Sequence, residues 1–158
     1  NQSIIEDQRD LDHCMDKYPH HIYQELIQGR EFSVDLFADI KGIPQLVVPR
    51  ERLSVRGGEV MMSRIDMNES IIDSVEALSR RLALTGPCNL QGILNENGTF
   101  LFTDLNLRFG SGSVHTIAAG GNIPLMIYQE MAGQSFFEPS IQNQSIMTRY
   151  PESIFHHS

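Results

Sequence analysis

The chain has 158 residues, with 41% hydrophobic and 20% charged residues and a formal net charge of −8 at pH 7. This length and composition predict one globular domain that buries a core without disulfide or metal staples. The acidic balance argues against binding to nucleic-acid backbones or to an anionic membrane surface. No apolar run approaches the roughly 18 residues that a membrane span needs. Two cysteines are too few for a disulfide framework, so we expect a cytoplasmic protein.

The first half of the chain predicts one short helix followed by several strands. Residues 8–18 carry apolar side chains at the spacing of a buried helical stripe and end before a proline. Strand character follows in three runs, at 21–27, 31–38 and 44–48, and two shorter strands flank residues 56–58. Strands that succeed one another through short turns predict an antiparallel sheet.

The second half alternates helices with a hairpin. Asn68 is a good N-cap for a helix over 68–83 with one apolar stripe. Strands are expected over 88–95 and 99–107, joined at Asn97-Gly98. Helices follow over 114–119 and 123–132, and an edge strand with a short helical turn over 146–150. The fold class is therefore α+β, an antiparallel sheet with packed helices.

The hairpin between these two strands gathers polar side chains on one face. A tight turn centred on Asn97-Gly98 places Gln91 opposite Asp104 and Asn89 opposite Asn106. The same register predicts that Ile93 lies opposite Phe102, nearer the turn. The other face, which we expect to pack on the core, carries Leu90, Leu101, Thr103, Leu105 and Leu107.

Carboxylate and amide oxygens grouped in this way suit a hard cation such as Mg²⁺. Asp104 supplies the charge, and Gln91 and Asn106 supply neutral oxygens. Arg108 follows Asn106 by two residues and is placed to reach an anion held by the metal. A solvated sheet face explains the same spacing equally well, so both interpretations stay open at this point.

Three segments in order resemble the C-terminal part of the ATP-grasp superfamily, and within it carbamoyl-phosphate synthase large-subunit-like members. Residues 23–35 resemble the hinge strand followed by the Gly-x-Glu strand of these proteins. Residues 89–91 resemble their first metal-ligand strand, and residues 104–110 resemble their Glu-x-Asn-x-Arg motif. The resemblance covers residues 20–133 and leaves 134–158 as the tail of a single domain over 1–158.

The resemblance implies an ATP-grasp-like C-terminal lobe that uses ATP and Mg²⁺ to activate a small carboxylate substrate as an acyl phosphate. Glu31 would hold the ribose hydroxyls and Ile93 would pack against the base. Arg108 would be the catalytic residue that stabilises the transferred phosphoryl group. The remaining implied roles are the adenine edge, lined by Gln24, Glu25, Leu26 and Ile27, and the Mg²⁺ ligands Gln91, Asp104 and Asn106.

Two departures from the family pattern bear on activity. Asp104 stands where the usual metal-bridging residue is a Glu, and its shorter side chain predicts one metal instead of two. An upstream lobe with lysines and a glycine-rich loop is not in the sequence, so we expect a fragment that is inactive alone. The alternatives are a non-catalytic nucleotide- or metal-binding module and an interaction domain that forms a homodimer.

Several further polar residues have both a functional and a plain structural interpretation. Arg50, Arg52 and Arg56 are placed to recruit an acidic substrate, but a solvated strand edge is the favoured interpretation. His115 is expected to have a surface or packing role, and Asp35 stays undecided. The segment 110–113 is either an anion-binding loop or a simple connection.

Overall fold

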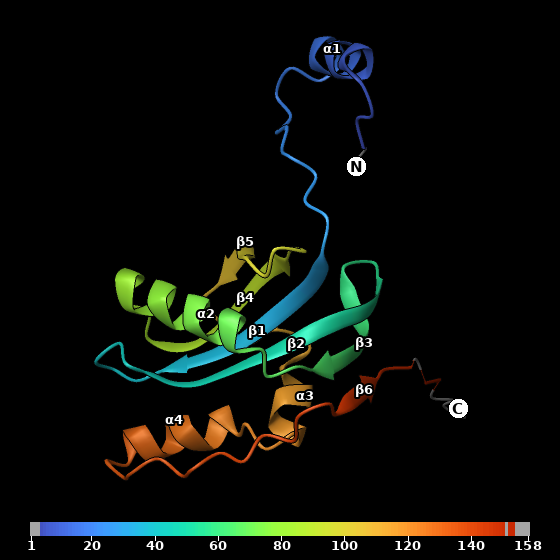
Figure 1. Ribbon diagram of the computed structural model, residues 1–158. Coiled ribbons are helices and arrows are strands. Elements are labelled where there is room, and N and C mark those ends of the chain that lie inside the picture. The colour runs from blue at the N-terminus through green and yellow to red at the C-terminus, as the bar shows by residue number, and fades with distance from the viewer. Residues whose placement is uncertain (1–3, 151, 154–158) are drawn as a thin grey trace, which may run out of the picture.

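The centre of the molecule is a six-stranded sheet with the order β5-β4-β1-β2-β3-β6, in which every pair of neighbours is antiparallel (Figure 1). This computed structural model describes residues 4–150, 152 and 153, so both extreme ends of the predicted domain lie outside the described residues. The α+β class is confirmed. The strands are β1 (Arg30–Ala38), β2 (Pro44–Arg56), β3 (Glu59–Ile65), β4 (Gly86–Leu94), β5 (Phe100–Asn106) and β6 (Ile146–Thr148).

Helices cover both faces of this sheet. The helix α2 (Glu69–Leu82) lies on one face, and α3 (Ser113–Ala118) and α4 (Ile123–Met131) lie on the other (Figure 1). Residues alternate between the two faces of a strand. Alternate residues of β1 therefore enter a core cluster with α2, whereas Phe37 enters a second cluster with Ile123 and Met126 of α4.

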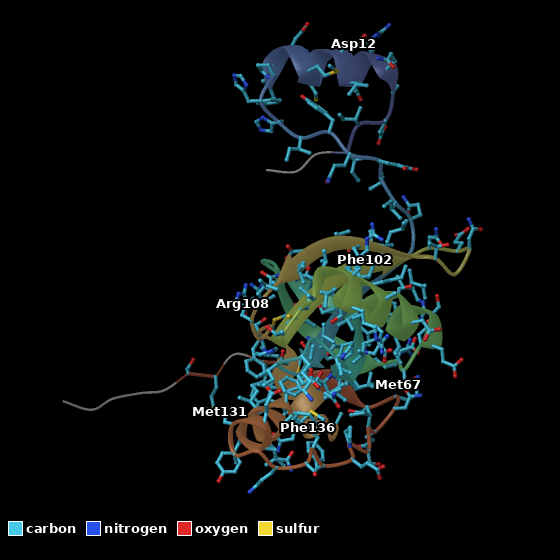
Figure 2. All side chains as sticks on the ribbon, turned by 90° about the vertical axis from the view of Figure 1, so that its left-hand side faces the viewer. Asp12, Met67, Phe102, Arg108, Met131 and Phe136 are labelled. Atoms are coloured by element: carbon cyan, nitrogen blue, oxygen red, sulfur yellow. The ribbon has the colours of Figure 1, made fainter. Side chains whose placement is uncertain are left out.

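The N-terminal helix stands apart from the sheet. Helix α1 (Gln8–Lys17) forms as predicted, and none of its residues, all of them described, is buried. Figure 2 shows this helix, with Asp12, well clear of the lobe that carries Arg108. The expected buried stripe is therefore wrong, since Met15 and Tyr18 are exposed.

The strand expected over 21–27 does not form. These residues are described, and within this segment the structure gives only one backbone hydrogen bond, from His21 N to the carbonyl of Tyr18. A strand needs a neighbour that pairs with its N–H and C=O groups. Within the described chain no strand lies beside this segment, so it runs as an extended connection to β1.

The hairpin of β4 and β5 confirms the predicted pairs Gln91–Asp104 and Asn89–Asn106. Its turn is longer than expected, because Asn95 N donates to the carbonyl of Thr99 and leaves residues 96–98 as the loop. A bulge between Gln91 and Gly92 compensates by leaving one extra residue in β5. The two deviations cancel at Gln91, which is why the register there is the predicted one.

Between the bulge and the turn, the prediction of which β5 side chains lie on which face of the sheet is wrong. Ile93 lies opposite Leu101, not Phe102, so Leu101 shares the face of Ile93. Phe100 enters the core next to α2 instead. Of the five residues expected on the core face only Leu90 is in the core; Leu107, for example, is 70% exposed.

The C-terminal part supplies the predicted edge strand, β6, which pairs with β3. The helical turn expected with it does not form in the described residues. Among the described helices, none is long and apolar enough to cross a bilayer.

Candidate functional site

Polar side chains from three neighbouring strands lie in register on the sheet face that α3 and α4 partly cover. Glu31 of β1 pairs with Ile93 of β4, and Ser33 pairs with Gln91. Gln91 in turn pairs with Asp104 of β5. We call this surface the polar face; it brings together the predicted site residues Glu31, Gln91, Ile93, Asp104 and Asn106.

The side chains of Asp104, Asn106 and Arg108 form a line of hydrogen bonds along one edge of the polar face. Asn106 Nδ2 donates to Asp104 Oδ2 at 2.6 Å, and Arg108 Nη2 donates to Asn106 Oδ1 at 3.3 Å. Arg108 Nη1 also donates to the carbonyl of Phe109 at 2.9 Å. Figure 2 shows Arg108 at the surface of the lobe. The i, i+2 spacing of an extended chain thus places a carboxylate, an amide and a guanidinium next to one another on the same side of the chain.

The oxygen atoms of the polar face form a ligand set that suits a magnesium ion whose other ligands are phosphate and water oxygens. Asp104 is its single carboxylate, and Gln91 and Asn106 add amide oxygens that currently accept hydrogen bonds from arginines. The described residues contain no group of three or more His, Cys, Asp or Glu side chains that could hold a metal. Mg²⁺ is commonly bound through one or two carboxylates, with phosphate and water oxygens completing the octahedron. The residues present fit that mode and not an all-protein cage.

A buried carboxylate lies beside the polar face. Asp35, 1% exposed, accepts from Arg50 Nε at 2.9 Å, from Asn89 Nδ2 at 2.8 Å and from Ser113 Oγ at 2.7 Å. Thr116 donates to it as well. These donors come from different elements, so the carboxylate of Asp35 fixes β1, β2, β4 and α3 to one another.

Arg50, the partner of Asp35, does not lie at the solvated strand edge that the sequence predicts. Instead β2 is an inner strand of the sheet, and Arg50 is 1% exposed. Strand order is a tertiary property, so the alternation of arginines in the sequence could not distinguish an edge from the interior. The sequence carries no local signal for this burial, because Glu51 and Arg52 follow Arg50 directly in β2.

His115 is buried, so of the surface or packing role expected for it the structure shows the packing role. Its Nδ1 lies 2.8 Å from Ser63 Oγ and its Nε2 lies 2.9 Å from Ser145 Oγ. Burial lowers the pKa of His115, the charge of Arg50 lowers it further, and Asp35 acts in the opposite direction. The ring is therefore held neutral between α3, β3 and the C-terminal segment.

A cavity of about 190 Å³ opens on the polar face. Arg50, Arg52 and Arg108 contribute three guanidinium groups to its wall, and the loop 110–112 closes one side. The described residues that line it include no carboxylate. A Cβ atom added to Gly112 would lie 2.4 Å from Arg50 Nη1, so only glycine lets this loop approach so closely.

The remaining predicted residues lie outside this cluster. Gln24, Glu25 and Leu26 are exposed and Ile27 is half-buried. Among the described residues, the structure gives these four no hydrogen bond to the polar face. It therefore does not bring the expected adenine edge together with the other predicted residues.

A comparison against protein families matches most of this chain. The family described as "ATP-grasp in the biosynthetic pathway with Ter operon" matches residues 17–152. The chain belongs to this ATP-grasp family. Comparison with curated protein sequences gives no match.

Solved structures share this fold at low sequence identity. N5-carboxyaminoimidazole synthetase from Staphylococcus aureus, complexed with ADP, has a TM-score of 0.70 at 12% identity, over 94% of this chain and 43% of that one. A biotin carboxylase–β,γ-ATP complex from Campylobacter jejuni has a TM-score of 0.61 at 16% identity, over 89% and 35%. L-amino acid ligase from Bacillus licheniformis has a TM-score of 0.57 at 18% identity, over 87% and 36%. The chain thus spans less than half the length of each.

Proposed function

We propose that this chain is the C-terminal lobe of an ATP- and Mg²⁺-dependent carboxylate ligase, of the carboxylate–amine or carbamoyl-phosphate synthase type. The observation that carries the proposal is the register that sets Gln91 opposite Asp104, with Asn106 and Arg108 hydrogen-bonded in line beyond it. Family membership supports the ATP-grasp part of the proposal. The named ADP and ATP complexes among proteins of the same fold support a nucleotide as ligand.

The polar face divides into two parts for this nucleotide. Glu31 would accept from the ribose hydroxyls, and Ile93 with its neighbour Leu101 offers an apolar surface to the base. Gln91, Asp104 and Asn106 would hold Mg²⁺, which supplies neutralisation of the phosphate charge. Residues 24–27 would line the adenine edge through backbone groups.

The proposed reaction has two transfers. A carboxylate oxygen of the substrate attacks the γ-phosphorus of ATP, the bond to the leaving oxygen breaks, and ADP departs from an acyl phosphate. An amine nitrogen then attacks the acyl carbon, the carbon–oxygen bond breaks, inorganic phosphate leaves and the nitrogen loses a proton. Arg108 would stabilise the charge on the transferred phosphoryl group, which is the principal catalytic requirement of such transfers.

We expect the 158-residue chain alone to bind nucleotide weakly and to turn over poorly. It spans 43% or less of the three ligases and carboxylases named above, so groups outside it would complete the site. The non-catalytic alternative predicts instead that the full-length encoded protein binds nucleotide but hydrolyses none.

A calorimetric titration with ADP, with and without Mg²⁺, tests the proposal in the full-length encoded protein. Asp104→Asn should abolish the Mg²⁺-dependent part of the affinity, because it removes the charged ligand. Asp73→Asn is the matched control, since Asp73 is an exposed carboxylate of α2 on the opposite face of the sheet. Equal Mg²⁺-dependent binding by Asp104→Asn and Asp73→Asn would contradict the proposal.

A further inference from the structure

Two arginines in the cavity wall hold buried N–H groups that bond to nothing among the described residues. Arg50 uses Nε and Nη2 for Asp35, and its Nη1 has no partner. Arg52 donates from Nη1, and its Nε has no partner. Buried donors are almost always hydrogen-bonded in native proteins, so each exception calls for a ligand, a water or an ion.

The sheet directs both side chains to the same place. Arg50 and Arg52 are two residues apart on β2 and share a face, and Arg50 lies opposite Ser33 in the register of β1 and β2. Both line the cavity, together with Arg108 and the loop 110–112. The cavity volume of about 190 Å³ far exceeds the ~10–15 Å³ that one water requires, so a small organic acid has room.

The charges around the cavity leave it attractive to an anion. Asp35 neutralises the charge of Arg50, and its two carboxylate oxygens also accept hydrogen bonds from Asn89 and Thr116. Within the part of the chain that the structure describes, Arg52 forms a salt bridge with one carboxylate, that of Glu31 at 3.3 Å, whose side chain is about half exposed. Among the described residues no carboxylate forms a salt bridge with Arg108.

We propose that this cavity is an oxyanion subsite that binds the carboxylate of the acceptor substrate, with Arg52 and the Nη1 of Arg50 as its donors. The inference rests on the proposed function, because that function requires a carboxylate beside Arg108. A planar guanidinium matches the geometry of a carboxylate and gives charge-assisted hydrogen bonds.

The contacts of Arg52 also link the subsite to the nucleotide. Arg52 Nη1 lies 3.2 Å from Gln91 Oε1 and 3.3 Å from Glu31 Oε2. The proposed function assigns Gln91 to the metal and Glu31 to the ribose. If Gln91 and Glu31 held the metal and the ribose, Arg52 would lose both of these contacts and its donors would be available to the substrate carboxylate. Nucleotide should therefore raise the affinity for the carboxylate, and the carboxylate should raise the affinity for nucleotide by the same factor.

The test is calorimetry on the full-length encoded protein with acetate, succinate and glutamate as carboxylate probes, each with and without Mg²⁺–ADP. Inorganic phosphate is the second probe, because a nucleotide phosphate is the other source of an oxyanion. Arg52→Gln removes one donor; Arg50→Lys keeps a charge beside Asp35 but removes Nη1. Arg56→Gln, an exposed arginine of the same strand, is the control.

We expect at least one carboxylate to bind more tightly with Mg²⁺–ADP present, and Arg52→Gln and Arg50→Lys each to weaken it about tenfold, as loss of a charge-assisted hydrogen bond does. Arg56→Gln should bind like the parent. Should Arg50→Lys fail to fold, Arg52→Gln alone decides the outcome. Carboxylate binding that is absent, or that is indifferent to Arg52, overturns the inference, as does Arg52-dependent binding of phosphate alone. The proposed function fails separately, if Mg²⁺–ADP itself does not bind.

Discussion

Arg52 Nη1 donates to Gln91 Oε1 at 3.2 Å across β1, which lies between their two strands. The same Nη1 lies 3.3 Å from a carboxylate oxygen of Glu31, whose side chain is 55% exposed. One guanidinium thus contacts two of the side chains that we assign to the Mg²⁺–nucleotide, Glu31 for the ribose and Gln91 for the metal.

Glu31→Gln should weaken the binding of ADP and leave the free energy of unfolding nearly unchanged. An exposed ion pair contributes about 1 kcal/mol or less, so the free energy of unfolding should change little. The affinity for ADP should fall several-fold, because the charged acceptor for the ribose hydroxyls is lost. Urea unfolding and ADP titration of the same preparation measure the two quantities. A large loss of stability with unchanged ADP affinity would make Glu31 a structural residue.

Asp35→Asn should strongly destabilise the fold. The substitution leaves the buried Arg50 charge without its carboxylate, and breaking a buried ion pair in this way costs about 3–5 kcal/mol. The midpoint of urea unfolding should fall accordingly, while Asp73→Asn on the exposed side of α2 should leave it near the parent value. A midpoint for Asp35→Asn equal to that of Asp73→Asn would mean that the pair contributes nothing to folding.

The hairpin illustrates how far the sequence predicts the site. The predicted pairing of Gln91 with Asp104 is confirmed, because the longer turn and the bulge after Gln91 compensate for each other at that pair. The facing of Leu101 and Phe102 was wrong, because a longer turn and a bulge at Gly92 shift the register between the site and the loop. Gly92 carries the only hint: a Cβ there would lie 2.5 Å from the ring of Phe100, so the close approach requires glycine.

The buried ion pair and the connection to α1 could not be predicted for a different reason. The roles of Arg50 and Asp35 depend on β2 and β1 being inner strands, and local sequence does not specify strand order. The segment 21–27 has strand-like composition, but pairing needs a neighbour, and the described chain supplies none. In both cases the missing information concerns contacts between distant segments.

His115 should make stability dependent on pH. Burial and Arg50 lower its pKa from 6.5, so the folded state binds the proton less readily than the unfolded state. Stability is fully present above the unfolded pKa and falls as pH drops through 6.5 toward the lower folded pKa. Urea midpoints measured between pH 8 and pH 5 should therefore decline, and more steeply in the parent than in His115→Gln. Identical slopes for the two proteins would show that other groups cause the decline.

Gly112→Ala should disturb the cavity without straining the backbone. Gly112 has a φ of −90°, which any residue adopts, so the cost comes from the added Cβ alone. That Cβ would lie 2.4 Å from Arg50 Nη1, within the guanidinium that Asp35 holds in place. Overpacking of this kind costs about 1–3 kcal/mol, and the melting temperature should fall by several degrees. Ser111→Ala, at an exposed neighbouring position, is the control and should melt like the parent. If Gly112→Ala melts as the control does, the loop moves away from Arg50 at little cost, and the unpaired Nη1 is accessible without any rearrangement of the sheet.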